Sequence, residues 1–75
     1  MRNIFWERVI IQIKDQNTTQ LKLATLIGIS YQRLRNWIYR NYIPDAVTAC
    51  EIAENLGTTV EYLVWGENRN PVPSR

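Results

Sequence analysis

The sequence predicts an all-α domain of five short helices. Apolar residues recur at helical spacing in five segments, each bounded by capping residues or glycines. No stretch of useful length alternates between apolar and polar residues as a strand does. The 75 residues give one small domain with a single core. We expect this domain over residues 1–66 and a linker or disordered tail over residues 67–75, which contain two prolines and no periodicity.

The first helix is expected from about Asn3 to Asp15. Its apolar residues recur at helical spacing, and Trp6 and Ile11 extend the apolar face further round the helix. A face this broad makes the helix either central to the core or shared with a neighbouring molecule. The residues expected on its inner face are Ile4, Phe5, Val9, Ile10 and Ile13.

Two short helices follow, joined by a turn. Thr19 is a good N-cap for the second helix, which is expected from Gln20 to Ile27 and stops at Gly28. Ser30 caps the third helix, expected from Tyr31 to Arg40. A glycine at the junction permits the left-handed backbone of a tight turn between helices. The residues expected to point inward are Leu23, Leu26 and Ile27 on the second helix and Leu34, Trp37 and Ile38 on the third.

The fourth and fifth helices are marked by their ends. Pro44 and the acid Asp45 start the fourth helix, and Gly57 ends it. Thr58 followed by Glu61 has the spacing of a capping box for a short last helix, which runs through Trp65 and is closed by Gly66. The apolar face expected on the fourth helix comprises Ala46, Ala49, Cys50, Ala53 and Leu56, with Cys50 buried.

Several function classes lack the residues that they need. The chain has no histidine and one cysteine, so we expect no metal site, no cofactor and no enzyme activity built on a nucleophile–base pair. A single cysteine cannot form an internal disulfide, which suits a reducing cytoplasm. Charges within the apolar start of the chain argue against a signal peptide, and no apolar run is long enough to cross a bilayer.

Charge is sorted along the chain, although the net charge is only +2. Residues 16–44 contain Lys22, Arg33, Arg35 and Arg40 and no acid, which gives +4. Residues 45–68 contain five acids and no base, which gives −5. Chance segregation over a short chain is the alternative, but the distribution favours one face meant for a polyanion and another kept away from it.

The predicted helix pair leaves a polar face on its second helix. Packing between the two helices uses the apolar residues, so the outward residues of the second one are free to bind. Arg forms two hydrogen bonds to guanine, Gln and Asn pair with adenine, and Tyr reaches a phosphate or a thymine methyl. The outward residues are Tyr31, Gln32, Arg33, Arg35 and Asn36.

The segment from Gln20 to Ile38 resembles the helix-turn-helix of the Cro/phage-repressor family. The resemblance continues through Ile43-Pro44, through residues 52–57 and through residues 60–63, and so covers about Thr19 to Gly66. It implies a five-helix, lambda-repressor-like DNA-binding domain, as in phage repressor N-terminal domains, with the helix-turn-helix at its second and third helices. In that arrangement the third helix enters the major groove of duplex DNA, and the second lies across the backbone.

The resemblance also implies roles for single residues. Tyr31, Gln32 and Asn36 fall where the family contacts base edges, and Gln20 falls where it holds a phosphate. Tyr31 is bulky where many members carry Gln or Ser, so the two arginines beside it either share in the base contacts or bind phosphate. The predicted base contacts are Tyr31, Gln32, Arg33 and Asn36, and the predicted phosphate contacts are Gln20, Lys22, Arg35 and Arg40.

The last helix predicts a second interaction. Tyr62, Leu63, Val64 and Trp65 are consecutive and cannot all face one small core. We expect Leu63 to point inward and Tyr62, Val64 and Trp65 to form a homodimer interface, since related repressor domains often pair through their last helix. The alternatives are an interface at Trp6 and Ile11 on the first helix, or dimerisation through a C-terminal domain beyond the tail.

The favoured function is sequence-specific binding of double-stranded DNA by a transcriptional repressor or regulator. It would act as a dimer on a palindromic operator in the cytoplasm, encoded by a bacterium or a phage. The alternative is a protein-interaction module on the same scaffold, such as an antitoxin or phage accessory protein. Its apolar anchors would be Trp6, Tyr62 and Trp65. Salt-dependent binding to duplex DNA separates the two functions, because only the first requires it.

Overall fold

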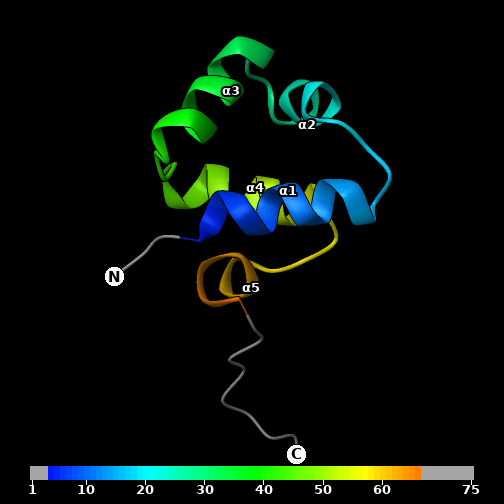
Figure 1. Cartoon of the computed structure of the whole chain (residues 1–75), viewed down its shortest axis with the longest axis vertical. Coiled ribbons are helices and arrows are strands. Elements are labelled where there is room, and N and C mark those ends of the chain that lie inside the picture. The colour runs from blue at the N-terminus through cyan, green and yellow to red at the C-terminus, as the bar shows by residue number, and fades with distance from the viewer. Residues whose placement is uncertain (1–3, 67–75) are drawn as a thin grey trace, which may run out of the picture.

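The computed structural model describes residues 4–66, which form five α-helices and no strand. In Figure 1, α2 and α3 lie at one end of the molecule, α1 and α4 across its middle and α5 at the other end. The all-α prediction is confirmed, and α2 and α3 have the predicted bounds. The helices are α1 (Phe5–Asp15), α2 (Gln20–Ile27), α3 (Tyr31–Arg40), α4 (Ala46–Asn55) and α5 (Val60–Trp65).

Side chains cap four of the five helices. Each capping residue has extended backbone, and its side-chain oxygen accepts a hydrogen bond from the backbone N–H three residues later. Such a bond satisfies one of the donors that a helix leaves unpaired in its first turn. The caps are Thr19, Ser30, Asp45 and Thr59, with N···O distances of 3.1, 3.1, 3.3 and 3.1 Å.

The start of α5 lies one residue later than the capping box predicted. The backbone N–H of Thr58 donates to the carbonyl of Ala53 at 2.9 Å and so closes the end of α4. Thr59 is the extended residue, and its hydroxyl accepts from the N–H of Tyr62. The Thr58–Glu61 prediction is therefore wrong, because either of two adjacent threonines can cap and the preceding helix end decides between them.

The broad apolar face of α1 left two possibilities, a central place in the core or contact with a neighbouring molecule. The structure places α1 in the core. Trp6 is only 3% exposed, and its indole N–H donates to the carbonyl oxygen of Tyr42 at 2.6 Å. The alternative interface at Trp6 and Ile11 is thus wrong for Trp6, although Ile11 is exposed. Trp6 is likewise unavailable as a surface anchor. The buried apolar residues are Phe5, Trp6, Val9, Ile13, Leu23, Ala24, Leu34, Ala49, Ile52, Ala53, Leu56 and Leu63.

Three residues expected to point inward are exposed. Leu26 is 55% exposed, because α2 packs on its neighbours through the side that carries Ala24. Ala46 and Cys50 on α4 are exposed as well, and the Cys50 thiol is free. Ile52 is fully buried, so the apolar face of α4 is centred further round the helix than expected.

The hydrogen bond of Trp6 gives a stability prediction. Trp6→Phe keeps an aromatic ring but leaves the Tyr42 carbonyl without its indole donor and opens a small cavity. We expect this change to lower the free energy of unfolding by about 2–4 kcal/mol. Denaturant unfolding measures the loss, with Trp65→Phe as the matched control, because Trp65 is 49% exposed. A loss below about 1 kcal/mol, equal to the control, contradicts this role for Trp6.

Candidate nucleic-acid interface

A tight turn joins α2 to α3 and sets the angle between them. Gly28 lies in the left-handed region with φ 81°. Its N–H donates to the carbonyl of Thr25 at 3.2 Å, and the N–H of Ile29 donates to the carbonyl of Ala24 at 3.0 Å. These two bonds close the end of α2, and Ser30 then caps α3. The predicted left-handed turn at Gly28 is therefore confirmed.

The inner side of α3 packs on the rest of the domain. Leu34 is fully buried, and Ala24 has no exposed surface, so α2 and α3 lie in close contact. Trp37 and Ile38 are half-buried against the core. The Trp37 ring centroid lies 6.4 Å from that of Trp6. This ring pair connects α3 to α1.

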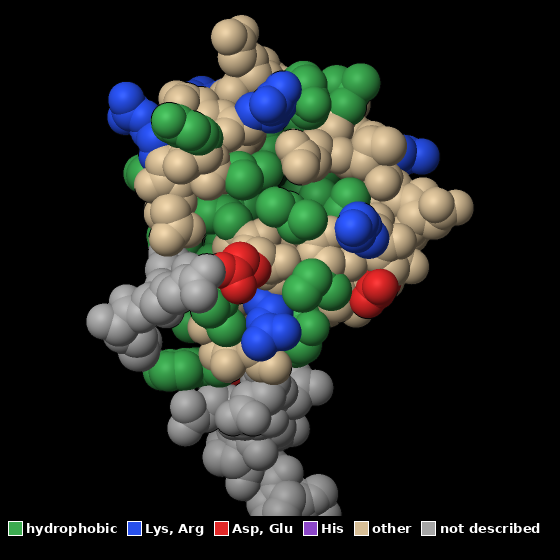
Figure 2. All heavy atoms as spheres, viewed as in Figure 1, with side chains coloured by type: hydrophobic (Ala, Val, Ile, Leu, Met, Phe, Trp, Pro, Cys, Tyr) green, Lys and Arg blue, Asp and Glu red, His purple; other side chains and the backbone are tan. Residues whose placement is uncertain are grey.

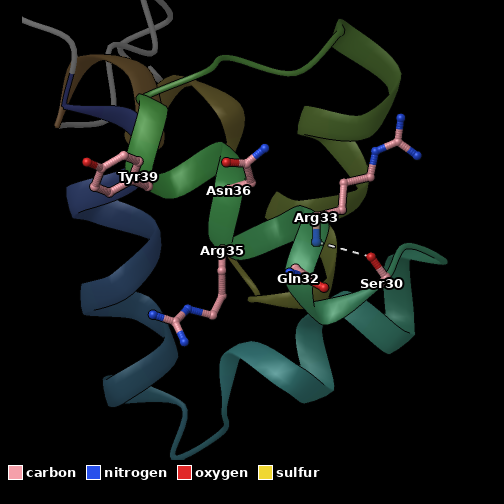
Figure 3. A pocket seen from close by; sticks show the side chains of 6 residues that line it. All are labelled: Ser30, Gln32, Arg33, Arg35, Asn36 and Tyr39. Carbon is pink, nitrogen blue, oxygen red and sulfur yellow. Dashed lines mark hydrogen bonds between the residues drawn. The ribbon is translucent and has the colours of Figure 1, made fainter.

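The outer side of α3 carries an exposed, polar face. The predicted residues Tyr31, Gln32, Arg33, Arg35 and Asn36 are all exposed. Figure 3 shows the face over α3, with the side chains of Gln32 and Asn36 extending from successive turns. An open hollow of about 730 Å³ lies along it. The residues that line this hollow are Ser30, Gln32, Arg33, Arg35, Asn36 and Tyr39.

Two arginines of this face rest beside aromatic rings. The guanidinium carbon of Arg33 lies 5.9 Å from the ring centroid of Trp37. That of Arg35 lies 5.8 Å from the ring centroid of Tyr31. At these distances each cation is attracted to the ring while its N–H groups stay open to solvent. The face therefore presents two positioned cations as well as neutral amides.

The remaining predicted contacts lie on α2 and at the end of α3. Lys22 and Arg40 are exposed, and Gln20 is half-buried in the first turn of α2. Gln20 lines a second hollow of about 540 Å³, between α1, α2 and α3, together with Lys14 and Arg35. Figure 2 shows Lys and Arg side chains spaced over the end of the molecule that carries α2 and α3. Gln20 and Arg35 therefore share one hollow, whereas Lys22 and Arg40 are exposed on α2 and at the end of α3.

A comparison with known families identifies this arrangement. The family model described as helix-turn-helix matches residues 11–63, which is more than half of the chain. The chain belongs to the Cro/repressor-type helix-turn-helix family. The family is one of DNA-binding regulatory domains and is typically not enzymatic, so DNA is the binding partner that it indicates. No curated protein and no solved structure gives a match to the chain.

The match covers all of α2, α3 and α4 of this helix-turn-helix domain. It contains the Gly28 turn and the whole polar face of α3. In the part of the chain that the structure describes, no group of His, Cys, Asp or Glu is placed to hold a metal ion. None of the described helices has the length and apolar character that a membrane span requires.

Tyr39 is a further member of the outer face, beyond the residues that the sequence analysis selected. It is 89% exposed and lines the hollow of α3. The sequence pattern that indicates this position is its spacing. Gln32, Asn36 and Tyr39 stand four and then three residues apart, on one side of a helix. Tyr42 differs, because its ring centroid lies 5.4 Å from that of Trp37 and its backbone carbonyl accepts from Trp6.

The predicted dimer residues lie on α5, at the other end of the molecule from α3 (Figure 1). Leu63 is fully buried, as predicted. Val64 and Trp65 are 42% and 49% exposed. Tyr62 is half-buried, with the guanidinium carbon of Arg8 at 5.7 Å from its ring centroid. The exposed apolar part of α5 therefore consists of Val64 and Trp65, with Tyr62 at its edge.

The turn before α3 gives a second stability prediction. Apart from its two chain neighbours, no residue has an atom within 4 Å of the position that a Cβ on Gly28 would take, so a substitution there costs backbone strain alone. We expect Gly28→Ala to lower the free energy of unfolding by about 1–2 kcal/mol, and Gly28→Asn by about half as much. Asn17 and Asn41 already adopt left-handed backbone in this chain. Thermal unfolding of both variants measures the difference, and equal stability of the alanine variant and the parent contradicts a constrained turn.

Proposed function

We propose that this helix-turn-helix protein is a sequence-specific transcriptional repressor or regulator. It binds duplex DNA as a homodimer, with α3 in the major groove of each half of a palindromic operator. Its site of action is bacterial or phage DNA in the cytoplasm. Residues 1–66 form the binding domain, and residues 67–75, a predicted linker or tail, lie outside the described residues.

The observation that carries the proposal is the exposed polar face of α3. Gln32 and Asn36 stand on successive turns of one side of the helix, and both line the hollow there. An α-helix with its side chains measures about 10–12 Å across and fits a major groove about 12 Å wide. The amides of Gln and Asn match the donor and acceptor pattern of adenine in that groove. These two residues, with Tyr31 and Arg33, are the proposed base contacts.

Other residues position the helix on the DNA backbone. Lys22, Arg35 and Arg40 are exposed cations of α2 and α3, and Gln20 lies in the first turn of α2. The N-terminus of a helix attracts phosphate because its backbone N–H groups are unpaired and its dipole is positive there. We assign phosphate contacts to these residues, and they carry little sequence information.

A dimer is required because one helix contacts too few base pairs for a unique genomic site. Val64 and Trp65 supply an exposed apolar patch on α5, away from α3. Pairing through this patch about a twofold axis would present two copies of α3 to successive major grooves, about 34 Å apart. The patch would equally suit the anchor of a protein-interaction module, so DNA binding itself decides between the two functions.

Salt dependence tests the proposal as a whole. Phosphate contacts from Lys22, Arg35 and Arg40 release counterions from DNA. We expect the logarithm of the association constant to fall with the logarithm of the salt concentration, with a slope between roughly −3 and −7 for a dimer. Fluorescence anisotropy with a duplex recovered by selection from a random pool measures this slope. A slope near zero on duplex DNA contradicts the proposed function.

Substitutions separate base contacts from backbone contacts. Gln32→Ala and Asn36→Ala should each weaken binding to the selected duplex by about 1–3 kcal/mol and relax the preference at particular base pairs. Lys22→Ala should weaken binding to all sequences alike and reduce the slope by roughly one unit per subunit. All three residues are exposed, so folding should change by less than about 0.5 kcal/mol. The assignment of helices is wrong if Lys22→Ala alters the sequence preference and Gln32→Ala leaves it unchanged.

The dimer is tested on α5. Trp65→Ala removes the largest exposed apolar side chain of the patch, so it should weaken dimerisation and cooperative operator binding by about tenfold or more. Sedimentation at several concentrations measures the association, and circular dichroism checks the fold. Tyr39→Ala is the matched control, because it removes an exposed aromatic side chain at the other end of the molecule. Unchanged dimerisation of the Trp65 variant excludes α5 as the interface.

A further inference from the structure

Arg33 and Arg35 leave α3 on opposite sides of its polar face. Each residue turns an α-helix by about 100°, so positions two residues apart point about 160° away from each other. Figure 3 shows the result: Arg35 extends toward α1 and α2, and Arg33 extends toward α4. Gln32, Asn36 and Tyr39 lie on the arc between them, and all five residues line the same central hollow.

On one side, Arg33 borders a hollow of about 260 Å³ between α3 and the start of α4. Trp37, Pro44 and Asp45 line the same hollow. The guanidinium carbon of Arg33 is held at 5.9 Å from the Trp37 ring centroid. The Asp45 carboxylate caps α4 by accepting from the N–H of Thr48. One cation and one fixed anion therefore border this hollow.

On the other side, Arg35 borders the hollow of about 540 Å³ between α3, α1 and α2. Lys14, Gln20 and Tyr31 line it as well. The guanidinium carbon of Arg35 is held at 5.8 Å from the Tyr31 ring centroid. Two cations and the first turn of α2 therefore border this hollow, which makes it the more positive of the two.

We propose that Arg33 and Arg35 bind phosphates on the two opposite strands that wall the major groove, while Gln32 and Asn36 face the bases between them. The inference rests on the proposed function, since it assumes that α3 enters the groove. A helix that fills the groove directs its central side chains at the base edges and its flanking side chains at the walls. Arg33, which the sequence assigned to a base edge, is a phosphate contact in this arrangement.

The aromatic neighbours explain why arginine stands at both positions. A guanidinium attracted to a ring face keeps its N–H fork free for two hydrogen bonds to a phosphate. Lysine would keep the charge but not the fork of N–H donors that matches a phosphate. Arg33→Lys and Arg35→Lys should therefore weaken binding about threefold or more, although the charge of the protein is unchanged.

Charge removal tests the proposal directly. Arg33→Gln and Arg35→Gln should each weaken binding to a mixed-sequence duplex of about 24 base pairs and reduce the salt slope by about one unit per subunit. Arg8→Gln is the control, because it loses the same charge at the α5 end of the molecule, where Arg8 lies over Tyr62. Thermal unfolding checks that each variant is folded. A slope unchanged in either arginine variant of α3 overturns the proposal.

Replacing single phosphates by neutral groups shows which DNA strand each arginine contacts. Methylphosphonate groups are placed one at a time along both strands of the selected duplex, and each removes the charge of a single phosphate. Arg33→Gln should abolish the effect of a substitution on one strand, and Arg35→Gln that of a substitution on the other. Loss of sensitivity on the same strand for both variants, or a changed base preference for Arg33→Gln, overturns the proposal.

The anion beside Arg33 supplies an independent test. Asp45→Asn keeps a side chain that caps helices well and removes a negative charge from the proposed phosphate site. It should strengthen binding about threefold at low salt, and Glu61→Gln on α5 should change it less. An unchanged affinity contradicts a phosphate beside Arg33. Failure of the proposed function gives a different result from failure of this inference, because the parent protein itself would then show no salt-dependent binding to any duplex.

Discussion

The hydrogen bond from the Trp6 indole to the Tyr42 carbonyl fixes where α3 lies. Trp6 belongs to the first turn of α1, and Tyr42 follows the end of α3, so one bond of 2.6 Å joins segments 36 residues apart. The Trp37 ring lies between them, with centroids 6.4 Å from Trp6 and 5.4 Å from Tyr42. The turn at Gly28 holds the other end of α3. With both ends held, α3 presents its outer face in one fixed orientation.

Local rules predicted the helix-turn-helix well. The bounds of α2 and α3 follow from Thr19, Gly28 and Ser30, whose caps and left-handed backbone depend only on nearby residues. The exposed polar face of α3 also follows from helical spacing, because a helix with one apolar stripe must turn its other residues outward. These features can be predicted without knowing which elements pack against the helix.

Tertiary packing decided the rest. Cys50 and Leu26 were expected inside and are exposed, because the rotation of α4 and α2 depends on which neighbour each helix meets. Trp6 was left undecided for the same reason, since its partner is a carbonyl far along the chain. The sequence also could not show that Arg33 and Arg35 border separate hollows, because those hollows are walled by α4 on one side and by α1 on the other.

In the proposed function, α3 and the first turn of α2 form the surface that meets DNA. Nuclear magnetic resonance tests it most directly, by titrating the nitrogen-labelled chain with the selected duplex and following every backbone amide. We expect the largest shifts on residues 30–40 and on residues 19–22, with smaller changes at Asp45. Largest shifts on α5, around Val64 and Trp65, with α3 unaffected, would contradict it.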